Sequence, residues 1–132
     1  MGREHRLHLQ LRWRDIDRLG HLNQAVYHDL LAEARLGLLT DLTGLTDADE
    51  AFDAWVVARV ELDYLAEVRR DHGEVEVIAR VGRLGNSSLQ IDYDIALPDG
   101  TIAASGSTVL VAWDLLQRRK RRISDAERAA LS

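Results

Sequence analysis

One long helical pattern, in a chain whose other patterns are those of strands, most constrains what this sequence can fold into. Between residues 26 and 42, apolar side chains recur with the period of a helix, and Asn23 is a suitable N-cap before them. The pattern predicts a helix of about 20 residues that ends before Gly44. Its apolar positions are Val26, Leu30, Leu31, Ala34, Leu38, Leu39 and Leu42.

Alternating apolar and polar residues predict one strand before this helix and four strands after it. Residues 7–13 alternate with a period of two, and residues 55–114 are rich in alternating and β-branched side chains. Breaks at 71–73, 85–87 and 98–100 have the composition of hairpin turns. We therefore expect the last four strands to form a meander.

The order of these elements predicts a single α+β domain over residues 1–132. One helix and five antiparallel strands must bury their apolar faces against each other, so we expect a curved five-stranded sheet wrapped around the central helix. Ser124 and Glu127 form a capping box for a short C-terminal helix, and residues 46–50 are expected to form a loop or short turn. Apolar residues on the outer strand faces predict a dimer or larger assembly.

Composition excludes several classes of function. The formal net charge of −5 argues against a nucleic-acid binder. The absence of cysteine excludes disulfides, a cysteine nucleophile and a thiolate zinc site, and it fits a cytoplasmic location. No apolar run reaches the roughly 20 residues that a membrane span needs. The basic run 118–122 is interpreted as a solvated segment, with a phosphate-binding patch as the alternative.

The segment from Asp15 to Asn23 carries the clearest chemical signal. If the alternation of the first strand continued, Asp15 and Asp17 would point toward the core, which is costly for an unpaired carboxylate. The alternative is that both aspartates cap a turn. The free N–H groups at the start of the helix, near Gln24, would attract an oxyanion or a thioester carbonyl. A carboxylate just before them could act as a general base or a nucleophile, which is the minimal machinery of acyl transfer.

The segment 13–23, with Tyr27 and residues 33–35 after it, resembles the signature of the 4-hydroxybenzoyl-CoA thioesterase-like hotdog family. It reads Trp13-Arg14-Asp15-Ile16-Asp17-Arg18-Leu19-Gly20-His21-Leu22-Asn23. The resemblance continues through residues 60–64, 85–88 and the apolar strand ending at Trp113, and covers about residues 7–128. It implies a hotdog-fold acyl-CoA thioesterase that works as a homodimer or homotetramer and uses no cofactor, because CoA is part of the substrate.

The resemblance also implies roles for residues. Asp17 would be the catalytic carboxylate, and the backbone N–H of Gln24 would polarise the thioester carbonyl. From their positions alone, His21 is a proton shuttle or orders the turn, Asn23 orients water or caps the helix, and Tyr27 lines the pocket or the core. Asp15 is the rival carboxylate.

The resemblance further implies substrate contacts from residues that the motif does not contain. Val57, Ala58 and Arg59 would approach the site from a partner subunit. Arg83, Ser87 and Ser88 would lie near the CoA phosphates, although the family's run of basic residues is absent here. Arg69, Arg70 or the basic run 118–122 are the alternatives, which keeps an acyl-carrier-protein substrate open.

Two other functions are weighed against hydrolysis. One is a hotdog module that binds acyl-CoA or acyl-carrier protein without cleaving it. The other is a hotdog hydratase or dehydratase, whose longer His and Asp motif is not found. No histidine spacing suggests a metal site. The acyl specificity, the choice between dimer and tetramer, and the choice between a nucleophilic and a general-base Asp17 stay open.

Overall fold

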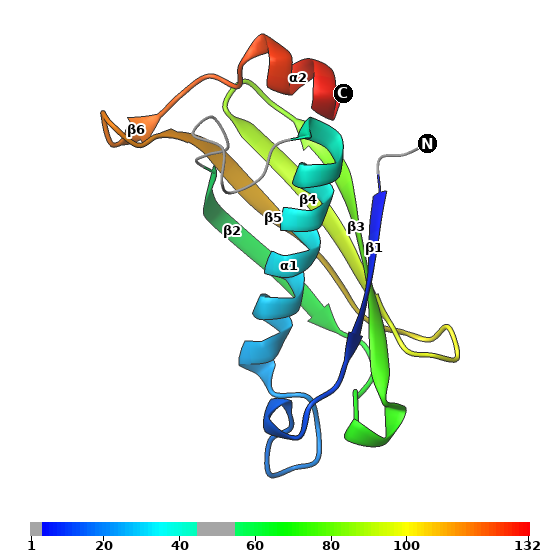
Figure 1. Cartoon of the computed structure of the whole chain (residues 1–132). Coiled ribbons are helices and arrows are strands. Elements are labelled where there is room, and N and C mark those ends of the chain that lie inside the picture. Colours follow the sequence, from blue (N-terminus) through cyan, green and yellow to red (C-terminus); the bar gives the residue numbers. More distant parts are fainter. Residues whose placement is uncertain (1–3, 45–54) are drawn as a thin grey trace.

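The computed structural model describes residues 4–44 and 55–132 and shows a curled sheet wrapped around one long helix (Figure 1). The predicted loop at 46–50 lies outside the described residues. In chain order the elements are β1 (Glu4–Gln10), η1 (Trp13–Asp15), α1 (Gln24–Thr43), β2 (Trp55–Tyr64), η2 (Arg70–His72), β3 (Glu74–Leu84), β4 (Ser88–Ala96), β5 (Ile102–Asp114), β6 (Arg119–Lys120) and α2 (Asp125–Leu131).

The long helix begins and ends where the sequence predicts. The side chain of Asn23 accepts a hydrogen bond from the N–H of Ala25, and this caps the start of α1. Gly44 closes the helix with a left-handed φ of 73°, and its N–H bonds to the carbonyl oxygen of Thr40. In the described part of the chain, no helix is long and apolar enough to cross a membrane.

The five long strands form one antiparallel sheet in the order β1-β3-β4-β5-β2, and the short β6 pairs with β5. The predicted meander is correct for β3, β4 and β5 but wrong for β2, which pairs with β5 at one edge of the sheet. Residues 65–73 are therefore a crossover connection and not a hairpin. The residue composition of a turn does not distinguish a hairpin from a crossover connection. It indicates where the chain bends, but not with which strand the next segment pairs.

The first strand ends three residues earlier than its alternation predicts. After Gln10, the N–H of Leu11 bonds to the carbonyl oxygen of Gly73, and the chain then enters η1. Trp13 is 74% exposed and does not join the core. The bonds between Arg12 and Asp15 stabilise this turn, and they override the period-two pattern.

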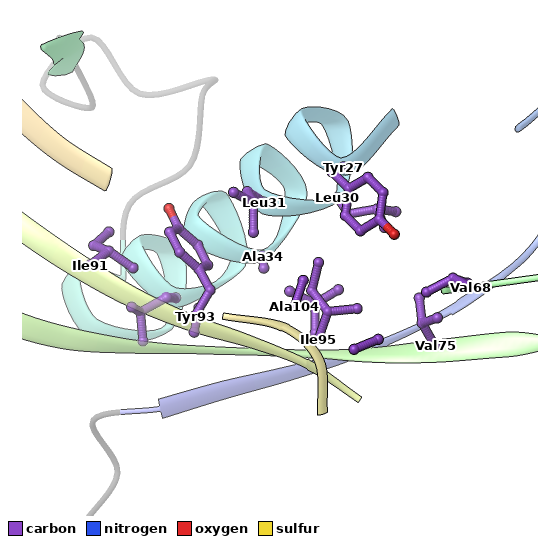
Figure 2. Close-up of a cluster of buried hydrophobic side chains, with 14 of the residues drawn as sticks. Tyr27, Leu30, Leu31, Ala34, Val68, Val75, Ile91, Tyr93, Ile95 and Ala104 are labelled. Atoms are coloured by element: carbon purple, nitrogen blue, oxygen red, sulfur yellow. The ribbon is translucent and has the colours of Figure 1, made fainter. Parts of the chain in front are cut away.

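The core lies between α1 and the sheet (Figure 2). Leu31 and Ala34 of α1 face Tyr93 and Ile95 of β4 and Ala104 of β5. Complete burial of a large apolar side chain such as Leu31 stabilises a fold by roughly 1.5–3 kcal/mol. The α1 helix packs most closely against β1 and β3, so the β2 side of the sheet receives less cover from it.

The outer face of the sheet differs from the expectation, because it is largely polar. Asp94 of β4 accepts hydrogen bonds there from Arg80 at 2.9 Å and from Ser105 at 2.7 Å. Exposed apolar side chains instead gather on the edge strand β2, at Val56, Val57, Val60 and Tyr64. The chain thus has an exposed apolar surface, but this surface lies at the β2 edge and not on the outer face of the sheet.

We expect Gly106→Ala to lower the free energy of unfolding by about 1–3 kcal/mol, measured by urea denaturation. A Cβ at Gly106 would overlap the backbone carbonyl oxygen of Glu61 and lie 2.9 Å from the Cα of Leu62. Gly85→Ala is the control, since its Cβ would meet mainly the rotatable hydroxyl of Ser88 at 2.7 Å. Equal losses in the two variants would contradict the close approach of β2 and β5.

Candidate active site

A tight turn before α1 positions the candidate catalytic residues. The N–H of Asp17 donates to the carbonyl oxygen of His21 at 2.9 Å, and the N–H of Gly20 donates to the carbonyl oxygen of Asp17 at 3.0 Å. Leu22 fixes the turn to the rest of the fold, because its N–H bonds to the carbonyl oxygen of Val68 at 2.7 Å. The turn is therefore held against both α1 and the β2–β3 connection.

The Asp17 carboxylate is fixed through one of its two oxygens. Its Oδ1 accepts hydrogen bonds from the N–H of Leu19 at 2.9 Å and of His21 at 3.3 Å. Its Oδ2 has no partner among residues 4–44 and 55–132. The group is half-buried at the wall of a pocket, so one oxygen is held while the other is available to a ligand.

The start of α1 supplies a free donor at the same place. Asn23 accepts from the N–H of Ala25 through its side chain and from the N–H of Val26 through its carbonyl oxygen. The N–H of Gln24, the first residue of the helix, has no partner in the described part of the chain. The partial positive charge of the helix terminus reinforces this donor. The structure thus shows the capping role of Asn23.

Asp17 and Gln24 line one pocket with a volume of about 390 Å³, which is within the range of small-molecule sites. Its walls come from the turn, the first turn of α1 and the chain that follows β2. They are formed by Asp17, His21, Leu22, Gln24, Tyr27, Tyr64, Leu65, Ala66, Glu67 and Val68.

Two tyrosines form the apolar side of this pocket. The rings of Tyr27 and Tyr64 pack edge to face, with centroids 4.9 Å apart and an interplanar angle of 86°. Tyr27 is buried, and its burial raises the pKa of its hydroxyl, which therefore stays neutral. Tyr27 both lines the pocket and belongs to the core, so the two predicted roles are compatible.

His21 begins a chain of polar side-chain contacts that the sequence did not suggest. Its Nε2 lies 2.7 Å from Oε1 of Glu67, and Oε2 of Glu67 lies 3.3 Å from a guanidinium nitrogen of Arg69. Arg69 in turn bonds to Asp71 at 2.9 Å, which lowers the pKa of Asp71. Glu67 is far from the motif in sequence, and no spacing pattern connects it with His21.

Asp15, the rival carboxylate, is occupied by structural contacts. It is 5% exposed, and both of its oxygens accept hydrogen bonds from Arg12, whose guanidinium and backbone N–H donate at 2.9–3.1 Å. The hydrogen bonds from Arg12 lower the pKa of Asp15 below its ordinary value of 3.8. Ionised Asp15 therefore stabilises the fold above that value, and this contribution is lost as the pH falls through the lowered pKa.

The other predicted substrate contacts lie away from this pocket within one chain. Val57, Ala58 and Arg59 are exposed on β2 and do not line it. Arg83, Ser87 and Ser88 lie at or beside the β3–β4 turn, near the opposite end of α1 (Figure 1).

In the basic run 118–122, some residues form ion pairs within the fold and others are exposed to solvent. Arg121 bonds to Glu127 at 2.7 Å and lies over the ring of Trp55, and Arg122 pairs with Asp125. Arg119 and Lys120 form the exposed strand β6. Within the described residues, no group of three or more His, Cys, Asp or Glu side chains is placed to hold a metal ion.

Comparison with known proteins agrees with this architecture. The model of a family described as the thioesterase-like superfamily matches residues 11–131. A predicted thioesterase from Bacillus stearothermophilus shares 26% identity over 97% of this chain and 93% of its own, with a TM-score of 0.85. A thioesterase from Thermus thermophilus, solved with coenzyme A and zinc, shares 33% identity over 96% of this chain and 95% of its own, with a TM-score of 0.82.

A DHNA-CoA thioesterase from Staphylococcus aureus has the same fold, with a TM-score of 0.81 and 20% identity over 91% of this chain and 80% of its own. No curated protein matches the sequence. The family match spans nearly the whole chain, including the turn before α1 and the four long strands that follow it. The chain, with its predicted hotdog fold confirmed, belongs to the thioesterase-like superfamily.

Proposed function

We propose that this protein is a cytoplasmic acyl-CoA thioesterase that hydrolyses an acyl-CoA to the free acid and CoA. The observation that carries the proposal is that Asp17 and the free N–H of Gln24 line the same pocket. A thioester carbonyl bound at the N–H of Gln24 has its oxygen at a positive helix terminus. Its carbon is then open to attack from the side of Asp17.

The reaction follows from these two groups. Asp17 either takes a proton from the attacking water or attacks the carbonyl carbon itself, with water then cleaving the resulting anhydride. In both routes the carbonyl electrons move onto the oxygen, and the N–H of Gln24 stabilises that charge. When the oxyanion collapses, the C–S bond breaks, CoA leaves as the thiolate, and the thiolate then takes up a proton.

His21 and Asn23 have positioning roles: His21 helps to orient Asp17, and Asn23 caps the start of α1. The contact of His21 with Glu67 and the backbone hydrogen bond from Asp17 to His21 support the orientation of the carboxylate. Asn23 caps α1 without using the N–H of Gln24, which leaves that donor for the substrate. Tyr27 gives the acyl group an apolar wall.

The substrate class is supported by the family and by two related structures. The Thermus thermophilus thioesterase was solved with coenzyme A and zinc, and a Staphylococcus aureus protein of the same fold was solved with CoA. Beside the pocket, the exposed Arg70 and the paired Arg69 offer cations for the CoA phosphates.

We further propose a homodimer in which the β2 edges of two chains pair antiparallel. One edge of β2 has no neighbour in the described sheet, and its exposed valines need cover. Antiparallel pairing places the first half of each β2 near the end of the other, where Tyr64 lines the pocket. Val57, Ala58 and Arg59 then reach the site of the second chain.

Asp17→Asn is expected to reduce kcat by about 100-fold or more, measured as thiol release from a panel of acyl-CoAs. The amide oxygen of asparagine can still accept the two turn hydrogen bonds, so the fold should be kept. Asp15→Asn is the matched control, and it should instead lower the free energy of unfolding by about 1–3 kcal/mol, because a buried acceptor of Arg12 is lost. If Asp17→Asn stays fully active, the assignment of the carboxylate fails.

Gln24→Pro should lower kcat by about 10²–10³-fold while α1 stays intact, because proline removes only the proposed oxyanion donor. Proline is well tolerated at the first position of a helix, and the extended backbone of Asn23 (φ −62°, ψ 134°) suits a residue before proline. Gln24→Ala keeps the N–H and should retain activity. Circular dichroism confirms the helix content of both variants. Equal activity of the two would eliminate this donor from the mechanism.

Val57→Lys should convert the dimer to a monomer in size-exclusion chromatography with light scattering, and activity should fall with it. A charge on the β2 edge would be buried without a partner. Leu36→Lys, which places the same charge at an exposed position of α1, should leave the dimer intact. A dimer that persists in a folded Val57→Lys variant would exclude pairing along β2.

A further inference from the structure

Two buried hydroxyls in the core have no hydrogen-bond partner. They are the hydroxyl of Tyr93, a residue 1% exposed, and Oγ1 of Thr108, a residue 0% exposed, and no other buried side-chain nitrogen or oxygen of the described residues lacks a partner. Each buried hydroxyl without a partner costs roughly 1–3 kcal/mol, and native interiors contain few of them. Two of them close together therefore need an explanation.

The two side chains lie on the same face of the sheet and on neighbouring strands. Tyr93 of β4 is paired with Gly106 of β5, and Thr108 follows two positions later, opposite Ile91. The Cα atoms of such diagonal neighbours are about 7–8 Å apart. Figure 2 shows the ring of Tyr93 rising from β4 toward α1, near Leu31 and Ala34. Both hydroxyls therefore lie in the layer between helix and sheet.

The helix-side face of β2 runs from the active-site pocket toward these hydroxyls. Tyr64, which lines the pocket, is paired with Ala104, and Val60 is paired with Thr108 four positions back along β2. At the rise of a strand, the two points are about 13 Å apart. Tyr64 and Val60 share one face of β2 and are 47% and 37% exposed, so the described residues cover this face only in part.

We propose that Tyr93 and Thr108 form a specificity site that binds a hydroxyl or carbonyl oxygen carried by the acyl group of the substrate. This inference rests on the proposed thioesterase function and names the substrate class for that site. An acyl group whose carbonyl binds at Gln24 would extend along this face of β2, and an oxygen at its far end would meet the two hydroxyls. Each hydroxyl can donate and accept, so both kinds of oxygen are suitable ligands.

Hydrogen bonding at this depth gives strong selectivity. A site built to bind a substrate hydroxyl rejects the analogue that lacks it, because the protein groups are then left buried and unpaired. A plain acyl chain would leave both Tyr93 and Thr108 without partners. The rival explanation is a buried water that bridges the two hydroxyls permanently, and it predicts no preference between substrates.

The test compares acyl-CoAs of equal length with and without a terminal hydroxyl, from hexanoyl to decanoyl. We expect kcat/KM to favour the hydroxylated member of one pair by about 10- to 100-fold in the wild type. The double variant Tyr93→Phe, Thr108→Val should lose this preference. Both substitutions keep the shape of the side chain and remove only a polar atom, so the variant should fold. Ser107→Ala removes a hydroxyl from the opposite face of β5 and should keep the wild-type ratio.

Binding of non-hydrolysable thioether analogues, measured by calorimetry, separates this inference from the proposed function. Tighter binding of the hydroxylated analogue by the wild type alone supports the specificity site, even if no thioester in the panel is cleaved. In that case only the hydrolytic function fails. Equal affinity for both analogues, or a preference that persists in the double variant, overturns the specificity site and assigns the hydroxyls to buried water.

Discussion

The active site depends on the packing of a single helix on a single sheet, because this packing fixes where the helix begins. The apolar face of α1 is buried mainly against the sheet, and its first buried residue, Tyr27, lies one turn from the N–H of Gln24. The turn before α1 is then fixed from two sides, through Asn23 to the helix and through Leu22 to the carbonyl oxygen of Val68. The packing of α1 on the sheet therefore also fixes the position of the Gln24 N–H.

The same turn gives two neighbouring aspartates different tasks. Both oxygens of Asp15 are bound by Arg12, which lowers the pKa of Asp15 and makes it part of the scaffold. Asp17 uses one oxygen for the turn and keeps the other at the pocket. A carboxylate that acts on a substrate needs one fixed oxygen and one accessible oxygen. If both oxygens are hydrogen-bonded, the group cannot accept a proton, and if neither is, the group is not held in position.

The sequence predicted the features that are determined locally. Asn23 and Gly44 carry their capping information in their own side chains, so the bounds of α1 were predictable. The pairing of β2 with β5 could not be predicted, because these strands are far apart in the chain. No hairpin turn connects them directly, so no local sequence signal indicates the pairing. Glu67 and Tyr64 reach the pocket through the same pairing, and for that reason the motif before α1 gave only half of the pocket wall.

The position of α1 over the sheet connects the edge strand with the buried hydroxyls. Because α1 packs most closely on β1 and β3, the helix-side face of β2 is left with less cover than that of β5, whose residues on that face are mostly buried. The apolar residues of β2 remain partly exposed, while the hydroxyls of Thr108 and Tyr93 are buried without a hydrogen-bond partner among the described residues. A folded protein retains such a combination only where something else completes the layer. In the two proposals, a second chain at the β2 edge would supply apolar contact to the exposed side chains, and an acyl group within the layer would supply partners for both hydroxyls.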